Sequence, residues 1–305
     1  MPSWFSGLLG KGTKSDVAAE QGPTGIGVSL PAPVPSAKFI AAGVGASSSH
    51  QLSVIGGDDR QEVHSATQKP WCAICYLECQ FGTDTYAGTG WMVDATTIIT
   101  AAHNLWNPPA VPGQPKRAAG KVDVITVSPA RLNASGGPFG TKVTNHFAYD
   151  RRWEELPDPV RRYYDYGVIF VDKPGFTLPF YFAPWALPPE KWDRSMRLNC
   201  AGYPVDRGCH FVTASGSACS ERPAGPLFIG PDQEMVIHNM DTEGGESGGP
   251  IFWTDGNRYY ALAVHTQGVG LAQGMNAGVR ITPKMIDVFN QWRANPNRQG
   301  PQTVE

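Results

Sequence analysis

The sequence lacks long apolar runs and lacks a strong excess of charge of either sign. No run approaches the roughly 18 apolar residues that a membrane-spanning helix needs. The formal net charge of −2 over 305 residues gives no indication of nucleic acid or an anionic membrane as a partner. Residues 1–11 also lack the basic flank and unbroken apolar stretch of a secretory signal. The compartment is therefore unknown from the sequence, and a cytoplasmic location stays open.

Cysteine is scarce, and its spacing does not complete a metal site. The six cysteines form two groups, which are Cys72, Cys75 and Cys79, and Cys200, Cys209 and Cys219. The first two have the spacing of zinc ligands, but no second Cys-x-x-Cys or His pair accompanies them, so we expect no metal. On a strand, Cys75 and Cys79 share one face, which suits buried thiols as well as disulfides. The pairing stays open, with Cys209–Cys219 as the best candidate for a bridge.

The first 53 residues contain little from which to build a core. Gly, Pro and Ser occupy 22 of these positions, and the apolar residues follow no sustained helical or strand period. Such a segment buries too little apolar surface to offset the entropy of ordering. We therefore expect residues 1–53 to be a disordered N-terminal tail, either a pro-segment or a flexible linker.

From residue 54 onward, short apolar runs alternate with turns rich in Gly and Pro. We expect strands at 71–77, 88–93, 97–101, 121–127, 166–171, 197–201, 210–214, 234–238, 250–253 and 259–264. Many short strands with little helix predict an all-β fold, either a barrel or a sandwich. The exception is the segment 282–293, where Met285, Ile286, Phe289 and Trp292 recur at helical spacing and predict a C-terminal helix.

The segment TEGGESGG at 242–249 surrounds Ser247 with glycines. Such a serine suits a nucleophile whose neighbours supply backbone N–H groups, although a Gly-rich turn alone is more often a plain loop. A base and an acid are available upstream, because His103 ends the motif TAAH and Asp165 begins the motif DYGVIFV. The order His, Asp, Ser, with separations of 62 and 82 residues, differs from the order in subtilisins and α/β-hydrolases.

These motifs resemble those of the chymotrypsin-like serine peptidases, and most closely the glutamyl endopeptidases of the V8 type. The matching stretches are VIGGDDR (54–60), DYG (165–167), GYP (202–204), DTEGGESG (241–248) and AVH (263–265). The likeness spans residues 54–292. The sequence departs from the family in two respects, since it shows no export signal and has Asn104 where members usually have a cysteine.

The resemblance implies a fold and a division into domains. It implies two six-stranded Greek-key β-barrels of the trypsin-like type with the active site in the cleft between them. His103 and Asp165 would come from the first barrel, Ser247 would come from the second, and the C-terminal helix would dock on the second barrel. The peptidase domain would span residues 54–295, and residues 296–305 would form a C-terminal tail.

The resemblance also implies a role for each residue of the site. Ser247 would be the nucleophile, His103 its general base, and Asp165 the acid that orients the imidazole. Asp150, Asp158 and Asp172 are rival acids, but Asp165 alone precedes a strand in the family's manner. The backbone N–H groups of Gly245 and Ser247 would bind the oxyanion. This chemistry needs no cofactor, and the substrates would be proteins or peptides.

Substrate preference would come from a pocket beside Ser247. By resemblance, Thr242 and His265 would bind a substrate carboxylate through a hydroxyl and an imidazole. We therefore expect cleavage after Glu, with Asp second. The alternative for His265 is a core histidine that has no part in binding.

The family's mature chain begins at a valine that matches Val54. We expect an activating peptidase to cut there and to free an α-amino group that reaches the pocket. A flexible tether or an address tail is the alternative for residues 1–53. For the whole chain, the alternatives to a serine endopeptidase are a catalytically weak or inactive peptide-binding relative and a cysteine- or zinc-dependent peptidase.

Overall fold

The computed structural model describes residues 54–55, 57–109, 118–133, 136–192, 196–208, 213–215, 227–229, 234–267 and 275–303. The tail expected over residues 1–53 lies outside the described residues. So does the disulfide expected between Cys209 and Cys219. The four cysteines that are described, which are Cys72, Cys75, Cys79 and Cys200, are buried free thiols.

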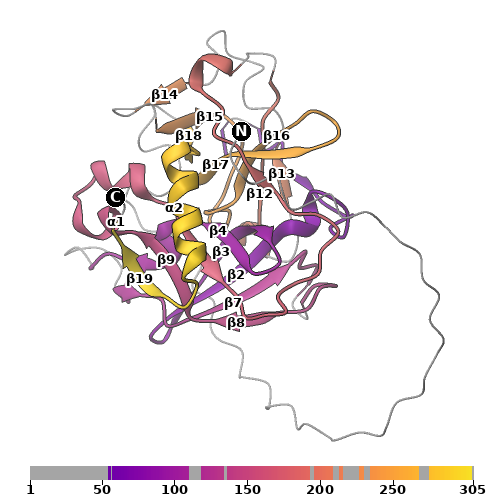
Figure 1. Ribbon diagram of the computed structural model, residues 1–305. Helices are drawn as coiled ribbons and strands as arrows, with labels where there is room; N and C mark the ends of the chain where they lie inside the picture. The colour runs from indigo at the N-terminus through magenta and orange to yellow at the C-terminus, as the bar shows by residue number, and fades with distance from the viewer. Residues whose placement is uncertain are drawn as a thin grey trace, which may run out of the picture. The chain divides into compact units, whose positions relative to one another are not determined.

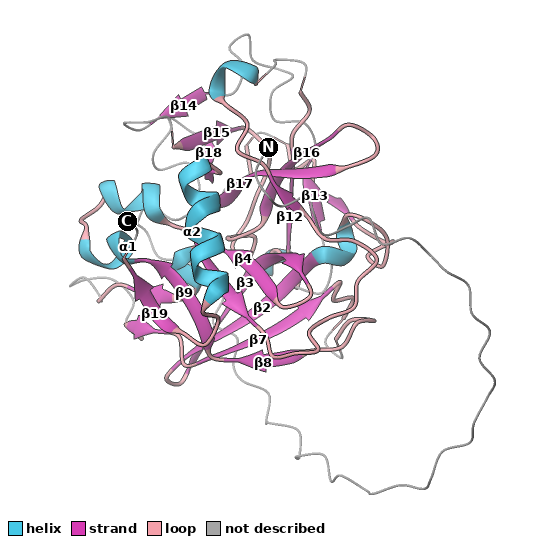
Figure 2. Ribbon diagram, in the orientation of Figure 1, coloured by secondary structure: helices cyan, strands magenta, loops and turns pink. Residues whose placement is uncertain are grey.

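Two β-sheets make up most of the described structure (Figures 1 and 2). The first sheet has the order β19 (Gln299–Gln302), β9 (His146–Asp150), β10 (Gly167–Phe170), β4 (Thr97–Thr100), β3 (Asp84–Asp94), β2 (Ile74–Phe81), β7 (Val124–Pro129) and β8 (Lys142–Thr144). Its strands are antiparallel except for the parallel pair β19 and β9.

The second sheet has the order β1 (Gln61–Glu62), β13 (Thr213–Ser215), β12 (Asn199–Gly202), β16 (Pro250–Thr254), β17 (Tyr259–Gln267), β18 (Asn276–Arg280), β15 (Met235–His238) and β14 (Leu227–Ile229). A further short strand, β11 (Ala183–Pro184), pairs in parallel with β17. A separate ribbon joins β5 (Trp106–Asn107) to β6 (Gly120–Lys121). The all-β prediction is confirmed, and both sheets gain short strands beyond the six expected in each barrel.

Helices are few among the described residues. The α-helices are α1 (Arg151–Glu155) and α2 (Pro283–Ala294), and the 3-10 turns are η2 (Trp71–Ala73), η3 (Ala102–Asn104), η4 (Val160–Tyr164), η5 (Pro189–Lys191) and η6 (Val205–Arg207). No helix in the part of the chain that is described is long and apolar enough to cross a membrane.

The strands that lead into the site are buried along their whole length. All residues of β4 and β10 are buried, which accounts for the apolar residues at the centre of each strand. The strand expected at 71–77 begins differently, because Trp71–Ala73 form a 3-10 turn before β2 starts at Ile74. The prolyl residue before this turn, Pro70, has helical backbone angles, and apolar composition alone could not distinguish that turn from a strand.

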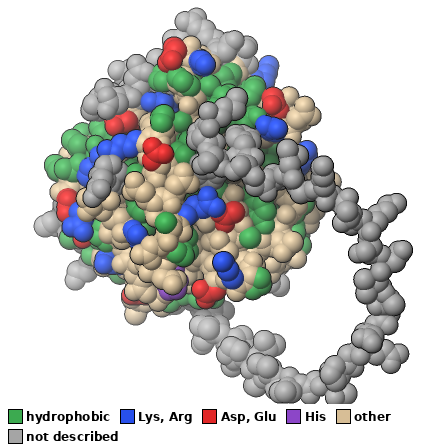
Figure 3. Space-filling view, in the orientation of Figure 1, with side chains coloured by type: hydrophobic (Ala, Val, Ile, Leu, Met, Phe, Trp, Pro, Cys, Tyr) green, Lys and Arg blue, Asp and Glu red, His purple; other side chains and the backbone are tan. Residues whose placement is uncertain are grey.

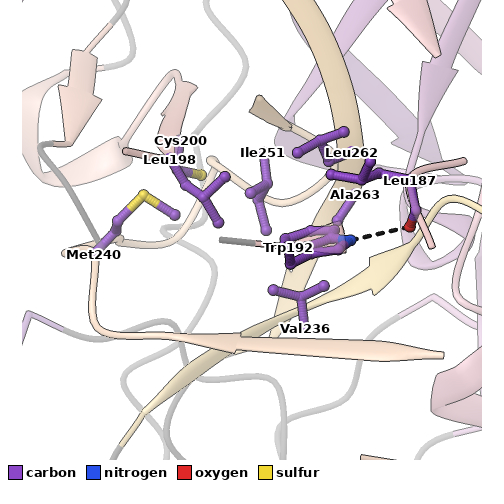
Figure 4. Packing of buried hydrophobic residues seen from close by; sticks show 9 residues of the cluster. All are labelled: Leu187, Trp192, Leu198, Cys200, Val236, Met240, Ile251, Leu262 and Ala263. Atoms are coloured by element: carbon purple, nitrogen blue, oxygen red, sulfur yellow. Dashed lines mark hydrogen bonds between the residues drawn. The ribbon is translucent and has the colours of Figure 1, made fainter. Parts of the chain in front are cut away.

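The core of the second sheet is an apolar cluster (Figure 4). Its buried members are Leu187, Trp192, Leu198, Cys200, Val236, Met240, Ile251, Leu262 and Ala263. Trp192 is the largest of them, and its indole N–H donates a 3.0 Å hydrogen bond to the carbonyl oxygen of Leu187. This bond satisfies the one polar group that the ring brings into the cluster. This apolar cluster therefore packs against the strands of the second sheet that flank the candidate site.

The predicted C-terminal helix is confirmed, but its contacts extend beyond the second sheet. Thr282 caps α2, since its hydroxyl oxygen accepts the N–H of Met285 at 3.1 Å. The rings of Phe289 and Trp292 lie 5.9 and 6.1 Å from that of Tyr166, just before β10 of the first sheet. Figure 1 shows the helix running from the β18 end of the molecule toward β9. The expectation that this helix docks on the second barrel must therefore be extended, because α2 also contacts the first sheet.

Residues 296–305, expected to be a tail, contain a strand. β19 pairs in parallel with β9, with Gln299 opposite Phe147, and lies beside it in Figure 1. The N–H of Phe147 also donates to the carbonyl oxygen of Arg298 at 2.6 Å. The segment QGPQ carries no apolar alternation, so only its pairing with the edge of β9 reveals it.

Charged side chains are mixed on the face drawn in Figure 3. Acidic and basic groups are interspersed there with apolar and neutral ones. This distribution agrees with the net charge of −2. No field of one sign is therefore apparent on that face.

Candidate active site

The pairing of β4 with β10 brings His103 and Asp165 together. Gly167 lies opposite Thr100 in this antiparallel pair, so the end of β4 meets the start of β10. Asp165 Oδ2 lies 2.7 Å from His103 Nδ1, and Asp165 Oδ1 accepts the backbone N–H of His103 at 2.9 Å. A carboxylate at Nδ1 favours the tautomer that carries its proton on that nitrogen. In this tautomer His103 Nε2 carries no proton and has the lone pair that a base requires.

His103 is partly exposed to solvent, whereas its partner Asp165 is not. Asp165 is fully buried, whereas the side chain of His103 is 17% exposed. The ring of Trp153 lies beside the imidazole in a tilted arrangement, with 6.3 Å between the ring centres. A buried carboxylate with several hydrogen-bond donors has a fixed orientation. The imidazole therefore has a fixed partner on one side and limited access to solvent on the other.

Two rival acids have structural partners of their own. Asp150 caps α1, where it accepts the N–H of Arg152 at 3.0 Å, and it also accepts the hydroxyl of Tyr166 at 2.6 Å. Asp158 pairs with Arg162 at 2.8 Å. Neither contact involves His103.

Ser247 lies on the loop between β15 and β16, and hydrogen bonds hold this loop against the first sheet. The carbonyl oxygen of Ser247 accepts the N–H of Thr89 at 2.9 Å and the side-chain amide of Asn104 at 2.9 Å. Asn104 directly follows His103 in η3. The nucleophile candidate is thus linked to the turn that carries the base candidate.

The glycines beside Ser247 are required by the backbone. Gly245 has a φ of +94° and Gly248 a φ of +91°, a region that side chains rarely enter. A Cβ at Gly245 would lie 2.4 Å from the carbonyl oxygen of Tyr203, and one at Gly248 would lie 2.2 Å from that of Thr89. The glycine-rich sequence is therefore explained by the shape of this loop and its close approach to neighbouring strands.

This loop leaves two N–H groups available. Glu246 and Gly248 donate theirs to the carbonyl oxygens of Glu243 and His265. Among the described residues, no hydrogen-bond acceptor is found for the N–H of Gly245 or of Ser247. Two free N–H groups beside a serine are the donors that an oxyanion requires.

Thr89 of β3 joins the two sheets at this loop. Its hydroxyl donates to the carbonyl oxygen of Gly245 at 2.7 Å and accepts the N–H of Tyr203 at 3.0 Å. Thr100 donates to the carbonyl oxygen of Thr89 at 2.7 Å. These buried hydroxyls satisfy backbone groups on both sides of the boundary between the sheets, so they fix the loop relative to β3 and β4.

Thr242 and His265 are both fully buried close to this loop. His265 and Ser247 belong to directly bonded segments, because the N–H of Gly248 donates to the carbonyl oxygen of His265 at 2.7 Å. Thr242 Oγ1 and His265 Nε2 are buried without a hydrogen-bond partner among the described residues. Buried polar groups are normally hydrogen-bonded, so these two are available to a polar group of a ligand.

A second buried histidine, His238, contacts His265. His265 Nδ1 lies 3.3 Å from His238 Nε2. Burial lowers the pKa of His238 to about 3. Burial, and then the neighbouring His238 and His103, hold the pKa of His265 well below its usual value. Both rings are therefore neutral at pH 7, and each carries one ring N–H.

The segment after Val54 is tied to the residue that precedes Thr242. Asp241 accepts the N–H of Ile55 at 2.6 Å and that of Asp59 at 2.8 Å. Asp241 is 2% exposed, and Val54 is half-buried. The beginning of the expected mature chain is thereby held next to the Thr242 loop.

Several of these residues were missed by sequence reasoning. Thr89 and His238 carry no motif, and Asn104 was noted only as a departure from the family. The contacts of all three join segments far apart in the chain. Asp241 was noted only as part of a family motif. The one local signal was the single histidine that ends the apolar run 234–238.

Comparison with known proteins identifies the family of the chain. The family described as a trypsin-like peptidase domain matches residues 88–260, more than half of the chain. The chain is 28% identical to a glutamyl endopeptidase of Bacillus licheniformis over 247 residues, which is 79% of this chain and 69% of that protein. It is 29% identical over 245 residues to an extracellular metalloprotease of Bacillus subtilis, with 79% and 69% of the two chains covered.

The name of the second relative refers to a metal. In the described part of this chain, no three His, Cys, Asp or Glu side chains form a group that could hold a metal ion. The described residues therefore offer no metal-binding group, and we assign no step to a metal.

Solved structures show the fold. A Glu endopeptidase in complex with MPD has a TM-score of 0.60 and 21% identity, covering 79% of this chain and all of that one. A protease from Arthrobacter nicotinovorans has a TM-score of 0.55 and 16% identity, covering 81% and 99%. The two sheets thus correspond to the two β-barrels of the trypsin-like fold, and the chain belongs to the family of trypsin-like serine peptidases.

Proposed function

We propose that this chain is a serine endopeptidase that cleaves peptide bonds after Glu, with Asp second. Membership of a peptidase family implies protein or peptide substrates. The observation that carries the proposal is the contact of His103 with a buried Asp165, next to a serine whose loop leaves two N–H groups free. Ser247 is the nucleophile in this proposal, and His103 is its base.

The proposed reaction has two halves. Ser247 Oγ attacks the substrate carbonyl carbon while His103 Nε2 takes the hydroxyl proton, and His103 then gives that proton to the leaving amine. An ester between Ser247 and the substrate remains. Water next attacks this ester, His103 accepts a proton from the water, and the proton returns to Ser247 as the acid product leaves. Asp165 holds the imidazole and stabilises its cationic form in both halves.

The free N–H groups of Gly245 and Ser247 would stabilise the negative charge that forms on the carbonyl oxygen. Removing one such donor costs about 3 kcal/mol of transition-state stabilisation in enzymes of this kind. Gly245 can present its N–H because its backbone adopts a positive φ. The hydrogen bond from Thr89 to Gly245 O fixes the neighbouring peptide group.

Thr242 and His265 support the preference for Glu. A carboxylate oxygen would accept hydrogen bonds from the Thr242 hydroxyl and from His265 Nε2, which are two of the buried polar groups without a hydrogen-bond partner among the described residues. His265 can donate from Nε2 if its Nδ1 accepts from His238 Nε2, which is the 3.3 Å contact. The two neutral histidines would then donate one hydrogen bond to the substrate carboxylate without placing a histidine cation in the pocket.

The test is active-site labelling and mutation of Ser247. The unchanged protein should react with a fluorophosphonate at Ser247 and should keep its activity in a metal chelator. Ser247→Ala should lower turnover on the order of 10⁶-fold while the fold is preserved. More than a few per cent of residual activity in purified Ser247→Ala protein would contradict the proposal. Inhibition by the chelator alone would favour a metal-dependent reaction, and absence of activity with intact fold would favour a peptide-binding protein.

A further inference from the structure

Arg60 is a buried cation close to the loop that carries Ser247. It is 5% exposed, and its guanidinium Nε donates to Asp58 at 2.9 Å. Nη1 donates to Asp206 at 3.1 Å and lies 3.6 Å from a carboxylate oxygen of Glu246. Burial alone would lower the pKa of Arg60, but its bonds with Asp58 and Asp206, together with the charge of Glu246, raise it. The side chain therefore stays cationic.

Glu246 directly precedes Ser247, and it is fully buried. Its carboxylate oxygen accepts the N–H of Glu243 at 2.8 Å, and its own N–H donates to the carbonyl oxygen of Glu243 at 3.1 Å. These two bonds close the turn from Glu243 to Glu246. Gly245 lies inside this turn with its positive φ. The direction of the Gly245 N–H is thus set by a turn that a buried carboxylate holds closed.

A buried carboxylate is costly without an opposite charge, and Arg60 supplies that charge. We propose that Arg60 is a positioning residue that acts through Glu246 to hold the N–H groups of Gly245 and Ser247 in place for the oxyanion. This inference rests on the proposed function and adds a residue that touches neither the substrate nor the reacting atoms.

The same side chain connects the segment after Val54 to the catalytic loop. Ile55 and Asp59 of that segment are bound by Asp241, and Arg60 follows directly. The segment therefore contacts the Ser247 loop at two points, one before Thr242 and one at Glu246. Order in this segment and the shape of the oxyanion site are coupled through Arg60.

The experiment is a double-mutant cycle with Arg60→Met and Glu246→Gln, measured on a Glu-containing ester in the chain form in which the unchanged protein is active. Arg60→Met should lower kcat by roughly 10-fold to 100-fold with KM changed less than about 2-fold, because oxyanion donors act in the transition state. Glu246→Gln should lower kcat less than Arg60→Met does, because a Gln side chain can still accept the Glu243 N–H. The double variant should recover to within a few-fold of Glu246→Gln, since no unpaired buried charge remains.

Arg207→Met is the matched control. Arg207 also pairs with Asp58, at 2.9 Å, and is more exposed than Arg60. The substitution removes the same charge but breaks no contact with Glu246, so kcat should not change. Arg60→Lys retains the charge and should restore part of the kcat. If Arg60→Met does not fold, Arg60→Lys replaces it in the test. The expected result is then a kcat below that of the unchanged protein with KM unchanged.

Three results would overturn the inference while leaving the proposed function intact. They are a double variant as slow as Arg60→Met, an equal loss in Arg207→Met, and a fall in activity that only follows the folded fraction in thermal unfolding. Failure of the proposed function would look different, because the unchanged protein itself would not be labelled at Ser247 by the fluorophosphonate.

Discussion

The side-chain amide of Asn104 donates a hydrogen bond of 2.9 Å to the backbone carbonyl oxygen of Ser247. Asn104 follows His103, so the proposed base and nucleophile are joined through one buried side chain in the absence of substrate. The same amide also donates to Thr100 Oγ1 at 2.9 Å. The two bonds fix Asn104 between β4 and the catalytic loop.

We expect Asn104→Ala to lower kcat by roughly 10-fold to 100-fold with little change in KM, because a misplaced nucleophile reacts slowly after normal binding. Asn107→Ala is the control, since the side-chain amide of Asn107 donates to the carbonyl oxygen of Ala118, and no hydrogen bond joins it to the Ser247 loop among the described residues. Steady-state kinetics on a Glu substrate checks the prediction. Equal kcat values for Asn104→Ala and the unchanged protein would show that Thr89 alone holds the Ser247 carbonyl.

The sequence was sufficient for the parts of the site that depend on local patterns. The apolar runs of β4 and β10 predicted buried strands, and the residues beside their ends, His103 and Asp165, are in contact. The apolar spacing within 282–293 predicted α2 and its buried face, whereas the cap at Thr282 was found only in the structure. Local periodicity is a strong signal for such elements.

The contacts between distant segments could not be predicted in the same way. The bond from Asn104 to Ser247 spans 143 residues, and the contact of Asp241 with Ile55 spans 186. A single polar residue in an apolar surrounding has no period that reveals its partner. β19 was missed for a related reason, because its four residues become a strand only beside β9.

The proposed pocket predicts a selective loss of cleavage after Glu. His265→Ala should lower kcat/KM for a Glu substrate by roughly 10-fold to 100-fold, which is the range expected for a hydrogen bond to a charged group. The value for a matched Gln substrate should change much less. Thr242→Val, which keeps the shape and removes the hydroxyl, should act in the same direction. Dominant cleavage after Arg or Phe in a peptide library would show that the pocket is misassigned.

His238 should make the protein less stable in acid. Its pKa is lowered in the folded state from 6.5 to about 3 by burial. Between these pH values the unfolded chain binds a proton at this residue and the folded chain does not. The free energy of unfolding therefore rises with pH across this window, and stability is lost as pH falls from 6.5 toward 3.

His238→Gln should remove this contribution, which is on the order of 5 kcal/mol at most. We expect a shallower fall of unfolding free energy from pH 6.5 to pH 4 in this variant, measured by chemical denaturation. His64→Gln is the control, because the side chain of His64 is 80% exposed. An unchanged slope in His238→Gln would mean that the buried histidine is not the group that titrates on unfolding.

The last prediction concerns the segment that Asp241 holds. Asp241 accepts the N–H groups of Ile55 and Asp59, and this places the half-buried Val54 close to Thr242. A cut between Ser53 and Val54 would create an α-amino group with a pKa near 8, largely protonated at neutral pH. Such a cation would pair with the substrate carboxylate, whose burial without a charged partner is costly.

We therefore expect the chain that begins at Val54 to hydrolyse Glu substrates faster than the full chain, with a smaller gain for a neutral substrate. Asp241→Asn should reduce the gain, because a neutral amide oxygen is a weaker acceptor for the two N–H groups. The measurement compares kcat/KM in both chain forms, with and without acetylation of the new terminus. Equal activity in both forms would leave residues 1–53 as a tether or an address. A gain that survives acetylation would instead mean that the segment acts by its position, through contacts such as those of Asp241, and not by its charge.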